Sequence, residues 1–208
     1  MKGKSYKRLD KNEAVVLLID HQTGLLNLVQ DYSPSELKNN ILALVDIAKY
    51  FKLPTILTTS FEDGPNGPLM PEIKAAFPKA PYIARPGQIN AWDNTDFVKA
   101  VKATKKKQLI IAGIVTDVCV AFPALSAIEE GYDVFVVTDA SGTFNKDMRD
   151  AALMRMVQAG AQTLSWFSVV SELHRDWRND VKGLAMLLAN HVPIYKNLMD
   201  SHQSKHVI

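Results

Sequence analysis

The stretch LIIAGIVTDVCVAFP, residues 109–123, decides the fold and contains the only cysteine of this 208-residue chain. It opens with an aliphatic run that predicts a buried strand and then passes through Gly113. Residues 118–130 are mostly apolar and predict a helix that stops at Gly131. Cys119 therefore falls in the first turn of the predicted helix, directly after a buried strand.

The position of Cys119 makes its thiol a candidate nucleophile. Unpaired backbone N–H groups and the positive end of the helix dipole would both favour the ionised thiol. A lone cysteine is also often a small apolar residue of the core, and this alternative stays open. Pro123 lies inside the predicted helix and indicates a kink or a later start.

Composition narrows the class of protein. With 47% hydrophobic residues the chain can bury a full core, and a formal net charge of +2 gives no reason to expect a nucleic-acid partner. The basic run at residues 105–107 fits a solvated loop. One cysteine excludes an intrachain disulfide.

No apolar stretch reaches the roughly 18 residues of a membrane helix, and residues 1–13 lack the apolar core of a signal peptide. We therefore expect a soluble cytoplasmic protein with no membrane partner.

Strands and helices alternate along most of the chain. Apolar runs predict strands, and periodic segments with start and stop signals predict helices between them. The predicted strands are residues 14–19, 54–59, 82–87, 108–114, 133–137 and 162–166. One predicted helix begins at Ser33, and the others cover residues 96–103, 118–130, 146–158 and 181–188. This alternation predicts one α/β domain over residues 1–208, a three-layer sandwich around a mainly parallel, doubly wound sheet.

Two segments depart from the alternation. Residues 60–93 are rich in proline and glycine, which favours either a wall of a binding site or a passive connector. Residues 171–208 combine charge with aromatic residues such as Trp177. That tail is expected to make subunit contacts, although a helix that closes the core is an open alternative.

Three side chains are predicted to meet at the carboxyl edge of the sheet: Asp20, Arg85 and Cys119. Attack of a thiolate on a carbonyl carbon needs a proton acceptor, a cation near the sulfur and donors for the oxyanion. Asp20 and Arg85 fit the first two roles, although each could equally be an ordinary strand-end cap or ion pair. His21 follows the strand-ending aspartate and is expected to point away from the site.

Four segments together identify a family resemblance. They are LLIDHQ from residue 17, YIARPGQINAWDN from residue 82, LIIAGIVTDVCV from residue 109 and VTDASGTF from residue 137. The chain resembles the isochorismatase-like cysteine hydrolases, which include nicotinamidases, N-carbamoylsarcosine amidase and isochorismatase, and especially the YcaC-type subgroup. This resemblance implies a Rossmann-like doubly wound sheet and a homo-octamer of two stacked rings.

The resemblance also implies a catalytic triad of aspartate, lysine and cysteine. Asp20 and Cys119 match directly, and Arg85 stands at the lysine position. A cis peptide bond is implied between Ile114 and Val115, so that the N–H groups of Val115 and Cys119 would form an oxyanion hole.

Three further residues, Gln22, Trp92 and Thr116, are expected to bind the substrate. Arginine supplies a cation but does not carry protons, because its pKa exceeds about 12, so acid–base work would fall to Asp20. Residues 58–64 lack the metal-binding histidine of nicotinamidases, so no metal or other cofactor is expected and nicotinamide is a poor substrate candidate.

These residues leave two functions open. The first is a cysteine hydrolase that acts on a small amide or related C–N acyl substrate through a covalent acyl-enzyme. The second is a non-hydrolytic oligomeric binding protein with a reactive thiol.

Overall fold

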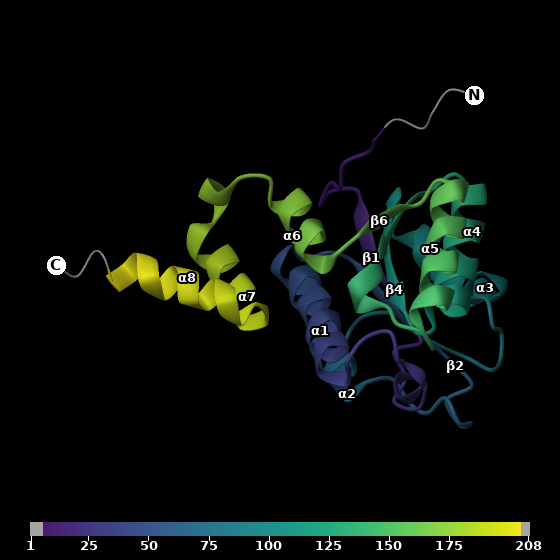
Figure 1. Cartoon of the computed structure of the whole chain (residues 1–208). Coiled ribbons are helices and arrows are strands. Elements are labelled where there is room, and N and C mark those ends of the chain that lie inside the picture. Colours follow the sequence, from purple (N-terminus) through teal and green to yellow (C-terminus); the bar gives the residue numbers. More distant parts are fainter. Residues whose placement is uncertain (1–5, 205–208) are drawn as a thin grey trace. The chain divides into compact units, whose positions relative to one another are not determined.

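A six-stranded sheet forms the centre of residues 6–173 in the computed structural model, which describes residues 6–204 of the chain. All neighbouring strands are parallel, and their order is β3-β2-β1-β4-β5-β6 (Figure 1). The strands are β1 (Ala14–Ile19), β2 (Thr55–Ser60), β3 (Tyr82–Arg85), β4 (Gln108–Gly113), β5 (Asp133–Val137) and β6 (Gln162–Leu164). The predicted doubly wound parallel sheet is thus confirmed.

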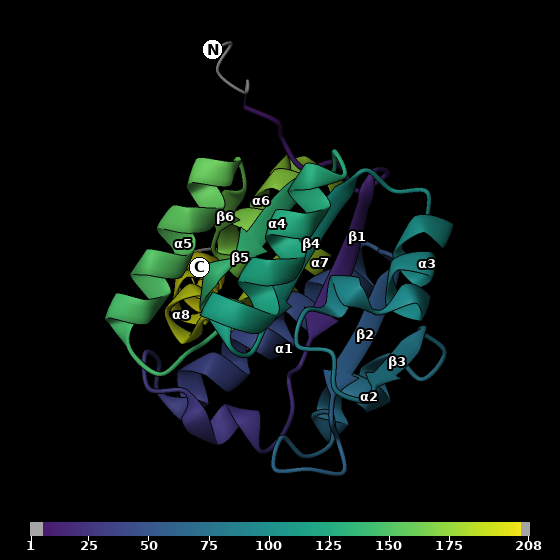
Figure 2. The ribbon, with the colours of Figure 1, turned by 90° about the vertical axis from the view of Figure 1, so that its right-hand side faces the viewer.

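Helices cover both faces of this sheet, which gives three layers. The helices are α1 (Pro34–Tyr50), α2 (Pro71–Ala76), α3 (Thr95–Ala103), α4 (Ala121–Glu129), α5 (Lys146–Ala159) and α6 (Trp166–His174). Helices α1 and α6 lie on one face and α3, α4 and α5 on the other; Figure 2 views the latter three from the front. Short 3-10 turns complete the unit: η1 (Leu25–Leu28), η2 (Ala91–Asp93) and η4 (Thr138–Ala140).

The sequence explains why these elements form. Every residue of β1, β2 and β4 is buried, as expected of strands that are covered on both faces. Strand β1 is apolar throughout, whereas β2 buries hydroxyl residues as well. Helix α1 begins where Ser33 accepts a hydrogen bond from the Glu36 N–H, with Pro34 as its first residue. Helix α5 ends at Gly160, whose φ of 109° lies in the left-handed region that favours glycine.

The predicted helix 118–130 differs from the observed structure. A π-helical turn, η3 (Thr116–Val120), comes first and holds Cys119, and α4 starts only at Ala121. Pro123 is the third residue of α4, in the first turn, where a missing N–H costs least. Gly131, with a φ of 86°, ends the segment as predicted. Residues 60–93 also contain more regular structure than expected, namely α2, β3 and η2.

The strand order places a switch point between β1 and β4. From β1 the chain proceeds outward to β2 and β3, and from β4 it proceeds outward on the other side to β5 and β6. Connections at this point diverge to opposite faces of the sheet, which leaves a crevice at the carboxyl ends of the two central strands. Asp20 and Cys119 follow these two strands, so the fold itself brings them together.

Residues 174–204 form a second compact unit. It contains η5 (Trp177–Asn179), α7 (Val181–His191) and α8 (Pro193–Ser204). The ring of Trp177 stacks on that of Tyr195, with centroids 6.2 Å apart and planes 7° from parallel. No described residue of α8 is buried. The predicted tail includes this unit, and its last four residues, 205–208, lie outside the described part of the chain.

No helix within residues 6–204 is both long and apolar enough to span a membrane.

Candidate active site

A buried ion pair joins Asp20 to Arg85. Arg85 Nη2 donates to Asp20 Oδ1, and neither side chain has any accessible surface. Asp20 follows β1 and Arg85 ends β3, with β2 between them. The long arginine side chain therefore crosses the carboxyl end of β2 to reach the aspartate.

The remaining donors of Arg85 are also engaged. Nε donates to Thr58 Oγ1 at 3.0 Å, and Nη1 donates to the carbonyl oxygens of Gln88 and of Ile89, the latter at 3.3 Å. The guanidinium group thus binds a carboxylate, a hydroxyl and a loop backbone simultaneously. The three donors of a lysine ammonium all lie on one nitrogen, whereas these acceptors are contacted by three different nitrogens of the arginine fork.

The backbone at Asp20 has an unusual conformation. Its φ of 56° lies in the left-handed region, which is uncommon for a residue with a side chain. The Asp20 N–H donates to Thr58 O at 2.9 Å, and Asp20 O accepts from the Gln22 N–H at 2.7 Å. These bonds hold the strained turn, and such strain is concentrated at functional sites.

Cys119 lies against the Asp20 carboxylate. Its thiol interacts with that carboxylate, and the N–H of Val115 is hydrogen-bonded to its sulfur. Burial raises the pKa of the Cys119 thiol well above its usual range, and the negative charge of Asp20 raises it further. The Val115 N–H and the Arg85 charge act in the opposite direction but do not prevail. The Val115 N–H at the helix start does favour the thiolate, as expected, but desolvation outweighs it.

The same balance applies to Asp20. Burial raises the pKa of Asp20, while the Arg85 charge opposes the rise. Arg85 carries one positive charge, which one negative charge on either Asp20 or Cys119 neutralises. Movement of one proton from the thiol to the carboxylate therefore leaves the net charge of the buried group unchanged.

The turn between β4 and η3 has the implied cis geometry. The Ile114–Val115 peptide bond is cis, as the family resemblance implies. Gly113 ends β4 so close to β1 that a Cβ atom there would lie 2.3 Å from Ile19 O. The Gly113 N–H donates to Ser141 Oγ at 3.2 Å, and this hydroxyl donates to Val137 O at 2.9 Å. The polar segment after β5 thus supports the turn that leads to Cys119.

Thr143 supports the same turn from the other side. Its Oγ1 donates to Asp117 Oδ1 at 2.6 Å, two residues before Cys119, and its N–H donates to Asp31 Oδ1 at 2.8 Å. Residues 137–144, which contain Ser141 and Thr143, entered the prediction through the family resemblance and were given no role at the site. The signal was present, because polar residues at the carboxyl end of a central strand face the site edge.

The three expected substrate-binding residues are placed differently from one another. Gln22 is buried, and its amide is occupied by the backbone: Nε2 donates to Ser60 O and Gly67 O, and Oε1 accepts from the Ser60 N–H. Thr116 is buried beside the cis peptide, and its hydroxyl has no hydrogen-bond partner among residues 6–204. Thr116 thus has a free polar atom near Cys119, whereas Gln22 has none.

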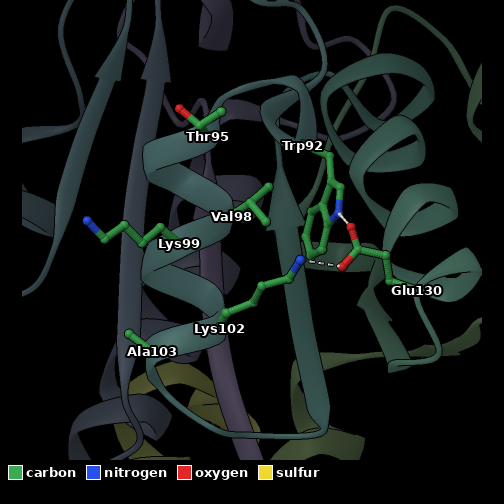
Figure 3. Close-up of a pocket in the computed structure, with 7 residues that line it drawn as sticks. All are labelled: Trp92, Thr95, Val98, Lys99, Lys102, Ala103 and Glu130. Atoms are coloured by element: carbon green, nitrogen blue, oxygen red, sulfur yellow. Dashed lines mark hydrogen bonds and ion pairs between the residues drawn. The ribbon is translucent and has the colours of Figure 1, made fainter.

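Trp92 points elsewhere. Its Nε1–H donates to Glu130 Oε1 at 2.8 Å, just beyond the end of α4 that is opposite Cys119. Trp92 lines a surface hollow of about 580 Å³ along α3. Figure 3 shows the indole beside Glu130, with which Lys102 Nζ also pairs at 3.0 Å. The structure does not bring the indole of Trp92 to the Asp20 and Arg85 pair.

His21 is buried, and its ring contacts the segment after β5. Its Nε2 lies 3.0 Å from Ala140 O, and burial lowers the pKa of His21 to about 4. The ring is therefore neutral at pH 7. Because a carbonyl oxygen only accepts, the single ring proton lies on Nε2, which donates to Ala140 O. Within residues 6–204, no three His, Cys, Asp or Glu side chains gather as a metal site.

The chain matches known proteins over most of its length. The model of the isochorismatase domain family matches residues 14–168. The probable hydrolase YcaC of Escherichia coli (strain K12) is 72% identical over 201 residues, which cover 97% of each chain. The solved structure of E. coli YcaC, described as an octameric hydrolase of unknown specificity, has a TM-score of 0.95 at 73% identity and covers 97% of this chain and 98% of its own.

YcaC from Pseudomonas aeruginosa is equally similar in fold. Its structure with hexane-2,5-diol and covalent acrylamide has a TM-score of 0.95 at 72% identity, covering 96% of this chain and 98% of that one. Together with the parallel sheet and the residues at its switch point, these matches settle the family. The chain belongs to the isochorismatase family and is an isochorismatase-family hydrolase.

Proposed function

We propose that the protein hydrolyses a small amide or related C–N acyl compound, with Cys119 as the nucleophile and Asp20 as the proton carrier. The observation that carries this proposal is the contact of the Cys119 thiol with a buried carboxylate that is already paired with Arg85. Among residues 6–204, no N–H or O–H donates to Asp20 Oδ2, so this oxygen is available for the thiol proton.

In the first step, the Cys119 sulfur attacks the acyl carbon while its proton moves to Asp20. The carbonyl oxygen becomes an oxyanion, for which the N–H groups of Val115 and Cys119 would be the donors. The C–N bond then breaks, Asp20 returns the proton to the leaving nitrogen, and a thioester on Cys119 remains. Arg85 stays protonated throughout and balances the negative charge of the pair.

In the second step, water cleaves the thioester. Asp20 accepts a proton from the attacking water, the C–S bond breaks, and the acid leaves while Cys119 recovers its proton. The raised pKa of Cys119 fits this scheme, because the thiol rests in its neutral form and loses its proton only as the new bond forms. Thr116, with its unpaired hydroxyl beside the cis peptide, would contact the substrate.

The covalent acrylamide on P. aeruginosa YcaC supports a nucleophile in this fold. We assign the equivalent reactivity in this chain to Cys119, its only cysteine. The test combines a panel of small amides with mass spectrometry of acrylamide-treated protein. Cys119→Ala should abolish both turnover and the adduct, and Asp20→Asn should slow both. Full turnover by the Cys119→Ala protein would refute the mechanism.

The second function, a binding protein with a reactive thiol, is favoured by one observation. Arg85 uses its donors on Asp20, Thr58 and a loop backbone, so it leaves proton transfer entirely to Asp20. A protein whose Cys119 forms the acrylamide adduct but which turns over no amide in the panel would support this function instead.

We further propose that the chain assembles as a homo-octamer, because E. coli YcaC is described as octameric at 73% identity. The exposed apolar residues of α8, including Ile194 and Leu198, would contribute to subunit contacts.

A further inference from the structure

Thr58 lies between the two charged residues of the proposed site. It belongs to the central part of the sheet, where it pairs with Ile19 of β1 on one side and with Ile83 of β3 on the other. Its side chain is fully buried, with 0% relative exposure. The large majority of polar side chains at this depth are hydrogen-bonded.

The hydrogen bonds of Thr58 involve both members of the ion pair. Its carbonyl oxygen accepts from the Asp20 N–H at 2.9 Å. Its Oγ1 accepts from Arg85 Nε at 3.0 Å. The hydroxyl proton is directed elsewhere, because Oγ1 donates to Ile83 O at 2.8 Å. That donation fixes the rotation of the hydroxyl and presents an oxygen lone pair to the guanidinium group.

We propose that Thr58 is a positioning residue, whose hydroxyl holds the Arg85 guanidinium in the place where it pairs with Asp20. The inference rests on the proposed function, since it concerns the same charged pair. Without the hydroxyl, the Nε–H of Arg85 would be buried without an acceptor, and the guanidinium would have to turn toward another one.

A displaced guanidinium has a measurable consequence at Cys119. The ionisable groups that act on Cys119 are Asp20 and Arg85, and those that act on Asp20 are Arg85 and Cys119. In both cases the Arg85 charge lowers the pKa. Weaker pairing of Arg85 should therefore make the thiol harder to ionise and slower to react.

The experiment measures the rate of Cys119 alkylation by iodoacetamide against pH in the full chain. It uses the wild type, four variants at Thr58 and Thr59, and the two reference variants Asp20→Asn and Arg85→Ala. Thr58→Val removes the hydroxyl at nearly constant volume, Thr58→Ala leaves more room, and Thr58→Ser keeps the hydroxyl. Thr59→Val is the matched control, because Thr59 is the next residue of β2, equally buried, and its hydroxyl meets Tyr82 rather than Arg85.

We expect Thr58→Val and Thr58→Ala to shift the profile to higher pH by about half a unit to one unit, which is a rate about three- to tenfold lower at fixed pH. Thr58→Ser should restore the wild-type profile, and Thr59→Val should leave it unchanged. Circular dichroism verifies the fold of each variant, and Thr58→Ala decides the result if Thr58→Val does not fold.

Two failures are distinguishable. If Asp20→Asn and Arg85→Ala shift the profile but Thr58→Val and Thr58→Ala do not, the positioning role is refuted and the proposed function stands. If Asp20→Asn and Arg85→Ala also leave the profile unchanged, the proposed function fails as well. A shift in Thr59→Val as large as that in Thr58→Val would show a general effect of β2 packing and would overturn the inference.

Discussion

Replacement of Arg85 by methionine should reveal what the buried ion pair contributes to stability. Methionine retains much of the apolar stem of arginine but removes the charge and the hydrogen bonds to Asp20, Thr58, Gln88 and Ile89. Asp20 would then be a buried carboxylate without a counter-ion. Removal of one partner of a buried pair typically costs about 3 to 5 kcal/mol, and we expect a loss of this size at pH 7.

The double variant Asp20→Asn/Arg85→Met is the matched control. It removes both charges, so no buried carboxylate is left to desolvate, although Thr58 and the loop carbonyls still lose their donor. We expect the double variant to be about 2 kcal/mol more stable than Arg85→Met alone, because that part of the loss is due to the uncompensated charge.

The effect should also depend on pH in a definite direction. In Arg85→Met, burial raises the pKa of Asp20 without the opposing arginine charge, so the folded state binds its proton more tightly than the unfolded state. Stability contributed by that proton is fully present below about pH 4, the unfolded value, and is lost as the pH rises toward the folded value. The penalty of Arg85→Met should therefore shrink in acid.

Urea denaturation followed by tryptophan fluorescence, at one fixed protein concentration, measures these differences. The concentration must be fixed because self-association would add to the apparent stability. A loss below about 1 kcal/mol for Arg85→Met, or a double variant no more stable than the single one, would refute the account of a tightly coupled buried pair.

Three further predictions concern other parts of the chain. Because burial lowers the pKa of His21 to about 4 from 6.5, wild-type stability should fall by about 3 kcal/mol as the pH drops from 6.5 to 4, and the difference from His21→Gln in urea denaturation should show this fall. A wild-type curve parallel to that of the variant would contradict the burial of a neutral ring. Gly113→Ala should destabilise the protein by several kcal/mol and slow alkylation of Cys119, because the added Cβ would lie 2.3 Å from Ile19 O. Gly87→Ala is the control, because a Cβ atom at Gly87 meets nothing within 4 Å. Ile194→Glu/Leu198→Glu should reduce the sedimentation coefficient, since these residues are 80% and 60% exposed and four positions apart on α8; an unchanged coefficient would remove α8 from the proposed subunit contacts.

Apolar patterning predicted much of the sheet. The runs at Ala14–Ile19 and Asp133–Val137 are strands with the predicted bounds, because strands buried on both faces are rich in apolar residues. The start of α1 at Ser33 and Pro34 was equally local, since a cap is made by neighbours in sequence. By contrast, α4 begins later than predicted, because the π-helical turn that delivers Cys119 depends on contacts with Gly142 and Thr143 from another part of the chain.

In the candidate site, too, some features follow from the sequence and others only from the tertiary structure. The sequence by itself determined that Asp20, Arg85 and Cys119 lie at or after the carboxyl ends of predicted parallel strands, and parallel strands bring those ends to one edge. Only the tertiary structure decided the ionisation of Cys119, because burial and Asp20, which is 99 positions away in sequence, raise its pKa more than the Val115 N–H at the start of its own helical turn lowers it. It likewise placed Gln22 among backbone groups and Trp92 beside Glu130, and it put Thr58 between two charges. Hydropathy patterns report which residues are buried, whereas the partner of a buried polar group is set by distances across the sheet.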